Sequence, residues 1–328
     1  MPDHALDAVS QRLLGLLQSE FPVTPDPYED LGAKLGIAGE EVIGRIEQMK
    51  TAGIVRLISP VLDARRLGYQ STLVALKIGK DRITGAERLI AGHPGISHGY
   101  EREHQFNIWV TLSVPPGTDL NSELRDLSSR TGADAIFSLA AVRVFKLRTN
   151  FSPAEEEAID SGEDDNTGLP VKADLSPADR EIVNVLQQDL PLSDNPFAAM
   201  AASIGISVDS LLTNSRSLLE RGIIRRYGAS VNHYNAGYKA NAMTCWEVHP
   251  HSVERTGRML AGLKQVSHCY ERETNELWHY NVFAMVHSQT RAACLRVIEK
   301  ISADTGISNY ATLFSTREFK KTRIKYRV

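Results

Sequence analysis

The chain has 328 residues, of which 42% are hydrophobic and 23% charged, and its formal net charge is −3. This length and composition predict a soluble globular protein of about two to four domains and favour a folded chain over a disordered one. There is no polybasic signature, no apolar run long enough to span a bilayer, and no signal-peptide pattern at the N-terminus. We therefore expect a cytoplasmic protein that is not inserted in a membrane.

The chain is built from two copies of one unit. Gly36 and Gly53 recur 169 residues later as Gly205 and Gly222. Further along, the offset becomes 174, because the second copy gains a longer loop at 274–279. A repeat of this length predicts two tandem copies of the same fold.

Each copy begins with a helical pattern. Apolar residues three or four positions apart predict an amphipathic helix near 9–17 and another near 182–186. In the first copy two more helices follow, at 28–35 and 40–52, and each stops at a glycine, as in the second copy. Short apolar segments at 54–58 and 223–227 resemble wings. We interpret residues 1–60 and 176–229 as winged helix-turn-helix domains.

The remainder of each copy, 61–150 and 230–328, reads β-α-β-β-α-β, which is typical of a ferredoxin-like fold. Helices would then cover one sheet face and leave the other available. The expected fold class is α+β, with two tandem copies of a winged helix-turn-helix domain followed by a ferredoxin-like βαββαβ domain. The strands are expected near 71–78, 96–103, 106–114 and 136–148, and near 239–248, 266–273, 280–287 and 310–325.

A linker at 151–175 joins the copies. Its part from 152 onward carries eight acidic residues against the single cation Lys172. Such a segment is expected to be solvated and long enough to let the copies dock as an internal pseudo-heterodimer. Further association into a homo-oligomer is also expected.

The helix-turn-helix domains lack the charge that a DNA-binding protein requires. Residues 6–58 hold five Lys/Arg against eight Asp/Glu, and residues 176–228 hold five against six. The first recognition helix opens with Gly39-Glu40-Glu41, which would repel phosphates. We therefore predict that these domains do not bind DNA specifically and serve as a scaffold.

One heptapeptide occurs in both copies with six of seven residues in common. It reads Ser97-His98-Gly99-Tyr100-Glu101-Arg102-Glu103, and then Ser267-His268-Cys269-Tyr270-Glu271-Arg272-Glu273. Because a strand alternates faces, His, Tyr and Arg should share one face, and Ser and Glu the other. A strand that only packs a core would place Val, Ile or Leu there. The pattern predicts a paired chemical site.

Other residues extend this site. The turn after the first heptapeptide should bring His104 beside Arg102, and Asn107 and Trp109 follow. In the second copy Asn281 and His287 are expected on a common face. Asn107 and Asn281 could instead only satisfy backbone groups.

The residue types narrow the chemistry. No metal motif or nucleophile elbow occurs. The three cysteines, Cys245, Cys269 and Cys294, are too widely spaced for a zinc or redox pair, and Cys269 is interpreted as a packing residue. Histidine transfers protons near neutral pH and arginine holds carboxylates, so we expect a polycarboxylate ligand that undergoes proton-coupled change.

Winged helix-turn-helix order followed by βαββαβ resembles the Lrp/AsnC regulators. The motifs resemble a narrower family, the sirohaem decarboxylases of haem d1 and alternative haem biosynthesis. His98-x-Tyr100-x-Arg102-Glu103-His104 is similar to the NirD (AhbA-like) subunit, and the motif from His268 through Asn281 to His287 is similar to the NirL (AhbB-like) subunit. The chain thus resembles a fusion of the two, although His279 stands where that motif leads us to expect proline.

The resemblance implies a carboxy-lyase that removes carbon dioxide from the acetate groups of rings C and D of sirohaem, an iron isobacteriochlorin, to give 12,18-didecarboxysirohaem. It implies no cofactor beyond the substrate's own iron and no other metal, and leaves open which histidine, if any, ligates that iron. Proton delivery would fall to His98, His104 or His268, aided by Tyr100 and Tyr270. The implied substrate-binding residues are Arg102, Arg272, Asn107, Trp109, Asn281, His287, Arg226 and Lys146.

Two other functions remain open on the sequence alone. One is an Lrp/AsnC-type transcription regulator with a small-molecule or haem effector, which tight DNA binding would favour. The other is a non-catalytic haem-binding protein, which tetrapyrrole binding without turnover would favour.

Overall fold

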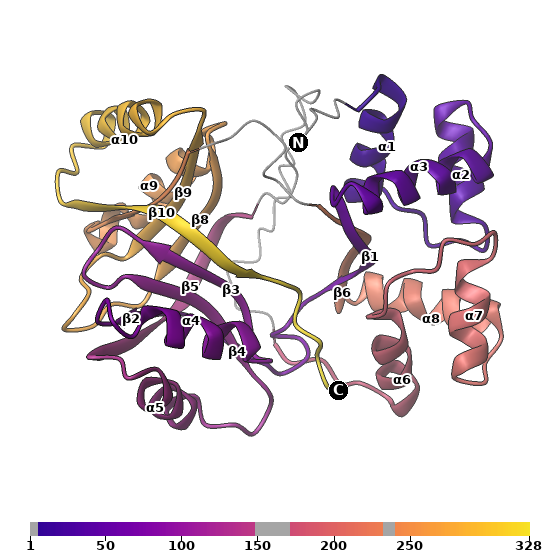
Figure 1. Cartoon of the computed structure of the whole chain (residues 1–328), viewed down its shortest axis with the longest axis horizontal. Helices are drawn as coiled ribbons and strands as arrows, with labels where there is room; N and C mark the ends of the chain where they lie inside the picture. The colour runs from indigo at the N-terminus through magenta and orange to yellow at the C-terminus, as the bar shows by residue number, and fades with distance from the viewer. Residues whose placement is uncertain (1–5, 148–170, 232–239) are drawn as a thin grey trace.

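The computed structural model describes residues 6–147, 171–231 and 240–328. It consists of two bodies, a helical one and a β-barrel with helices on its outside (Figure 1). Each body contains elements from both copies, so the copies are joined along their whole length.

The helical body contains both helix-turn-helix domains. The first copy supplies α1 (Ala8–Ser19), α2 (Pro27–Leu35) and α3 (Gly39–Thr51), and the second supplies α6 (Pro177–Leu186), α7 (Pro196–Ser203) and α8 (Val208–Glu220). A capping box between Ser176 and Asp179 begins α6, and Gly36 ends α2 in the left-handed conformation. Apolar faces from all six helices pack into one core, which confirms the predicted helices.

The wings differ from the expectation. β1 (Val55–Leu62) and β6 (Ile224–Val231) are single strands that pair antiparallel with each other as a two-stranded sheet. A single strand would leave its backbone N–H and C=O groups without hydrogen-bond partners. Here the strand of each copy supplies those partners to the strand of the other. Both strands pass the domain boundaries expected at 60 and 229.

Each copy contributes a βαββαβ unit, as predicted. The first has β2 (Gln70–Lys77), α4 (Ile83–Gly92), β3 (Ile96–Arg102), β4 (Ile108–Val114), α5 (Leu120–Thr131) and β5 (Ala135–Leu147). The second has β7 (Ala240–Trp246), a 3-10 turn (Pro250–Ser252), α9 (Val253–Ala261), β8 (Val266–Arg272), β9 (Val282–Ser288), α10 (Arg291–Thr305) and β10 (Tyr310–Lys321).

The two sheets close into one barrel of order β10-β3-β4-β2-β5-β8-β9-β7. Closure uses the last strand of each copy: β5 pairs with β2 of its own copy and β8 of the other, and β10 pairs with β7 and β3. The expectation that one face of each sheet stays available as an open surface is therefore wrong. This face points into the barrel, where Trp109, Phe137, Trp278 and Phe283 form an aromatic core.

The segment after β10 ties the barrel to the helical body. Arg323 donates from Nη1 to the Ser59 carbonyl at 2.8 Å, and the Tyr326 amide donates to Gln187 Oε1 at 2.7 Å. The C-terminus lies near α6 (Figure 1). The edge of the barrel that carries the ends of β5 and β10 consequently faces the helical body.

No single helix in the described segments is long and apolar enough to cross a membrane, although α7 and α8 taken together meet that test across a bend of 94°. Of the predicted linker 151–175, residues 151–170 lie outside the described residues. Its last part binds the helical body, since the Ala173 amide donates to the Arg66 carbonyl at 2.8 Å and Leu175 is buried.

Candidate functional site between the barrel and the helical body

The repeated strands β3 and β8 present the predicted chemical face. His98 stacks beside Tyr100 with ring centroids 6.5 Å apart, and the guanidinium of Arg102 lies 5.1 Å from the Tyr100 ring centre. In the other copy, His268 stacks on Tyr270 at 6.3 Å and Arg272 lies 4.7 Å from that ring. Each face is thus a continuous ladder of imidazole, phenol and guanidinium.

The opposite face also follows the prediction, with one exception. Gly99 meets the Phe319 ring, and Glu271 pairs with Arg143, on the side covered by the outer helices. The serines do not stay on that side. A register shift before His98 and another before His268 bring each serine hydroxyl to its neighbouring imidazole. Ser97 Oγ lies 2.9 Å from His98 Nδ1, and Ser267 Oγ lies 2.7 Å from His268 Nδ1.

Both arginines hold buried charge without a carboxylate partner among the described residues. Arg102 donates from Nη1 to the Leu313 carbonyl at 3.1 Å and to Ser315 Oγ at 2.9 Å. Arg272 donates from Nη1 to the Leu139 carbonyl at 2.9 Å. The Nε atom of each is buried and has no hydrogen-bond partner in the described part of the chain. Burial lowers the pKa of Arg102 to about 10 and also lowers the pKa of Arg272.

Two imidazoles are held neutral. Burial, followed by the charges of Lys321 and Arg56, lowers the pKa of His98 to about 4. Burial, followed by Lys321 and Arg102, lowers the pKa of His287 to about 4. Both rings are therefore uncharged at pH 7, each beside fixed cations that oppose its protonation.

The two faces have different neighbours across the copy interface. Lys321 of β10 lies opposite His98, and Glu318 lies opposite Tyr100. In the other half, Val144 of β5 lies opposite Tyr270 and remains 45% exposed. On the strand from the other copy, the first face therefore has charged neighbours, whereas Tyr270 of the second face has an exposed apolar neighbour.

Similarity to known proteins extends over the whole chain. A family model described as "AsnC-like ligand binding domain" matches residues 66–146 and 235–320. A model described as "Siroheme decarboxylase NirDL-like HTH domain" matches residues 10–56 and 179–225. The siroheme decarboxylase of Hydrogenobacter thermophilus is 39% identical over 319 residues, which are 96% of this chain and 94% of that protein. The chain belongs to the siroheme decarboxylase NirDL family.

Other relatives agree with this family. The siroheme decarboxylase NirDL subunit of Paracoccus denitrificans is 30% identical and covers 96% of both chains. A crystal structure of the siroheme decarboxylase NirDL has a TM-score of 0.77 at 36% identity and covers 97% of this chain and 94% of that one. Another, in complex with an iron-uroporphyrin III analogue, also has a TM-score of 0.77, at 35% identity and with 98% and 95% coverage. Family membership favours the decarboxylase over the regulator.

In this NirDL family member, His104 does not lie beside the other proposed proton donor of the first copy, His98. It follows β3 in the turn, six residues from His98, a separation of about 20 Å along an extended chain. Its Nδ1 accepts from the Phe106 amide at 3.1 Å, and its ring packs against Trp278 from the other copy at 5.3 Å. The two imidazoles do not form a pair, because His98 lies near the start of β3 and His104 lies beyond its end.

Asn107, Asn281 and Trp109 have structural partners. Both side-chain amide atoms of Asn107 bond the backbone of Ile78, at 2.9 and 3.0 Å, and Asn281 does the same to Val248, at 2.8 Å. The structure thus favours the backbone-satisfying alternative for both. Trp109 is buried and donates from Nε1 to the Phe106 carbonyl at 2.8 Å, so it belongs to the barrel core.

Two predicted cations lie off the site. Lys146 is opposite Cys269, on the face covered by α9, and donates to the Leu263 carbonyl at 2.9 Å. Arg226 donates to the Gln18 carbonyl of α1 at 2.7 Å. Its neighbour Arg225 points the other way, because adjacent strand residues alternate, and its charge lowers the pKa of Tyr270 against the larger raising effect of burial.

Several cations of the site were not predicted from the sequence. They are Lys321, Arg56, Arg65 and Arg225. Arg65 acts on Tyr270 as Arg225 does, and donates to the Ala141 carbonyl at 3.3 Å. Arg56 and Arg225 occupy equivalent positions of the repeat, a signal that would have identified them. Lys321 had no such signal, since only barrel closure places it beside His98.

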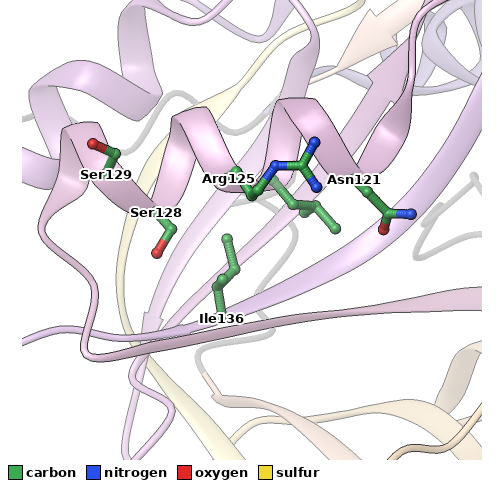
Figure 2. A pocket seen from close by; sticks show the side chains of 6 residues that line it. Asn121, Arg125, Ser128, Ser129 and Ile136 are labelled. Carbon is green, nitrogen blue, oxygen red and sulfur yellow. The ribbon is translucent and has the colours of Figure 1, made fainter.

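A surface pocket of about 480 Å³ lies elsewhere, between α5 and β5 (Figure 2). It is lined by Asn121, Leu124, Arg125, Ser128, Ser129 and Ile136, none of which belongs to the site. The three cysteines are buried free thiols, and burial raises the pKa of Cys269 to about 12, which supports its packing role. The described residues contain no group of three or more metal ligands.

Proposed function

We propose that this chain is a carboxy-lyase that removes carbon dioxide from the acetate groups of rings C and D of sirohaem and yields 12,18-didecarboxysirohaem. The relatives named above are siroheme decarboxylases, and one NirDL structure holds an iron-uroporphyrin III analogue. The proposal requires no cofactor beyond the iron-tetrapyrrole substrate.

The observation that carries this proposal is the pair of buried guanidiniums. Arg102 and Arg272 have no carboxylate partner among the described residues, and each has an unsatisfied Nε. An uncompensated buried charge is costly, and an anionic ligand would offset that cost. A tetrapyrrole with several carboxylates supplies such anions, and arginine binds them through paired hydrogen bonds.

The imidazoles then supply the proton. Loss of carbon dioxide leaves an electron pair on the side-chain carbon, which the conjugated macrocycle stabilises until a proton converts the group to methyl. Burial is the main cause of the lowered His98 pKa, and the charges of Lys321 and Arg56 add to it; substrate carboxylates beside these two cations would offset their part. Binding would thereby raise the pKa of His98 and allow it to act as a general acid. Tyr100 and Tyr270 hold the imidazoles and guanidiniums in line.

Anaerobic incubation with sirohaem, followed by mass analysis of the tetrapyrrole, tests the proposal. We expect a product lighter by two molecules of carbon dioxide. Binding without any change of mass would instead support a haem-binding protein. Sedimentation of the purified chain measures the predicted homo-oligomer separately.

A further inference from the structure

Ser267 lies between two imidazoles that are far apart in the sequence. Ser267 is only 1% exposed. Its Oγ is 2.7 Å from His268 Nδ1 and 2.6 Å from His287 Nε2. His287 is on β9, and the register shift before His268 is what turns the serine toward both rings. Three side chains thereby form one hydrogen-bonded row.

A hydroxyl has one proton to give and lone pairs to accept, and a neutral imidazole has one donor and one acceptor nitrogen. Ser267 therefore accepts from one ring while it donates to the other. When His287 donates from Nε2, Ser267 donates to His268 Nδ1, and His268 carries its own proton on Nε2. The row is then oriented from His287 toward His268.

The first copy has only part of this arrangement. Ser97 Oγ lies 2.9 Å from His98 Nδ1. The position equivalent to His287 is Ser113, whose hydroxyl lies 2.6 Å from Ser71 Oγ instead. Among the described residues, a second imidazole beside the repeated Ser-His pair therefore occurs in the second copy and not in the first.

We propose that Ser267 is a positioning residue that passes a proton from His287 to His268, and that this row keeps His268 neutral while it delivers the proton for one of the two decarboxylations. The inference rests on the proposed function. As the carbon–carbon bond breaks and carbon dioxide leaves, His268 Nε2 gives its proton to the side-chain carbon. His268 Nδ1 takes the proton of Ser267, and Ser267 takes the proton of His287 Nε2. His287 Nδ1 takes one from a water molecule, which becomes hydroxide and carries the negative charge that the substrate loses with its carboxylate. One proton is consumed, and both rings end neutral with their tautomers exchanged. A return shift, in which His268 Nε2 takes a proton from solvent and His287 Nδ1 releases one, restores the starting state before the next turnover.

The surroundings favour a route in which no ring becomes charged. Lys321 and Arg102 both act on His287, and burial adds to their effect on its pKa. A stepwise relay through an imidazolium would place a third cation among them. A shift of protons along the row exchanges the tautomers of the two rings without that cost.

Ser267→Ala tests the proposal in the full chain with sirohaem under single-turnover conditions. We expect one of the two decarboxylations to slow by about 10- to 100-fold, less than the loss of a general acid itself, with unchanged affinity and accumulation of a mono-decarboxylated product. In mixtures of light and heavy water, the plot of the parental rate against deuterium content should be curved, because several protons move together. The same plot for Ser267→Ala should be a straight line, because one proton moves. A serine that only supports the fold would not change this shape.

His287→Ala and the double variant complete the test, with Ser113→Ala as the matched control outside the row. Substitutions within one hydrogen-bonded row should not have additive effects on the activation free energy. The variant that carries both Ser267→Ala and His287→Ala should therefore be no slower than the slower single variant. Should Ser267→Ala not fold, His287→Gln interrupts the same row. The relay would be overturned if a folded Ser267→Ala variant kept the parental rate and the parental curved dependence on deuterium content. It would also be overturned if the rate losses of the two single variants multiplied in the double variant. Failure of the unchanged chain to release carbon dioxide would overturn the proposed function itself.

Discussion

Arg102 of the first copy donates a hydrogen bond of 2.9 Å to the hydroxyl of Ser315 on the last strand of the second copy. The equivalent strand position opposite Arg272 is Ala141, which has no hydroxyl. The two buried guanidiniums are thus held by different partners although their own strands are nearly identical. Each half of the site is completed by the other copy.

Replacing either arginine should weaken substrate binding more than it weakens the fold. Arg102→Met removes a buried charge that has no described carboxylate partner, so the free energy of unfolding should change little or rise. A hydrogen bond to a charged group contributes about 1.5–3 kcal/mol, so the affinity for sirohaem should fall by about 10- to 100-fold. Spectroscopic titration and thermal unfolding measure the two effects. Reduced stability with unchanged affinity would make Arg102 structural only.

His98 and His104 should behave differently when replaced one at a time. His98→Ala should slow decarboxylation by about 10²- to 10⁴-fold, the contribution of a positioned general acid. His104→Ala should retain catalysis and lower stability, because its ring packs on Trp278. Single-turnover rates and urea unfolding of both variants check this. A His104 variant as slow as the His98 variant would instead show that both imidazoles of the first copy take part in catalysis.

Stability should depend on pH through His98. Its pKa is lowered from 6.5 to about 4 in the folded chain, so between these values the unfolded state binds more protons. The free energy of unfolding should therefore rise with pH across this window and level off above it. His98 should contribute at most about 2 kcal/mol between pH 5 and pH 7. Urea unfolding at both pH values, with His98→Gln as comparison, measures the difference, and an equal slope in the variant would contradict it.

The two copies should stay together after the linker is cut. Antiparallel pairing of β5 with β8, of β10 with β3 and of β1 with β6 joins them independently of the linker. A protease site placed within 151–170 and then cleaved should leave fragments that co-migrate in gel filtration at micromolar concentration. Their separation would mean that the linker maintains the assembly.

Binding to duplex DNA should be weak and unselective even at low salt. The first turn of α3 carries Glu40 and Glu41, and the first turn of α8 carries Asp209. Acidic residues at these positions repel the phosphates that a recognition helix must approach. Footprinting on the promoter of the gene that encodes this chain checks the prediction. Protection of that DNA at nanomolar protein concentration would contradict it.

The sequence by itself determined the local structure and the chemistry of one face. Helix periodicity, the glycine stops and the β-α-β-β-α-β order depend on neighbouring residues, and the structure confirms them. Period-two alternation was likewise enough to place His98, Tyr100 and Arg102 together. Repetition of this pattern at 268–272 indicated a second, related face.

Only the tertiary structure decided what borders those faces. Lys321 reaches His98, and Val144 reaches Tyr270, because the last strand of each copy crosses to the sheet of the other. Ser267 meets His287 because a bulge alters the alternation that the sequence pattern assumes. His104 is separated from His98 by the length of β3, and Lys146 is turned to the outer face by its register. Contacts between strands far apart in the sequence depend on barrel closure and register, which no local pattern encodes.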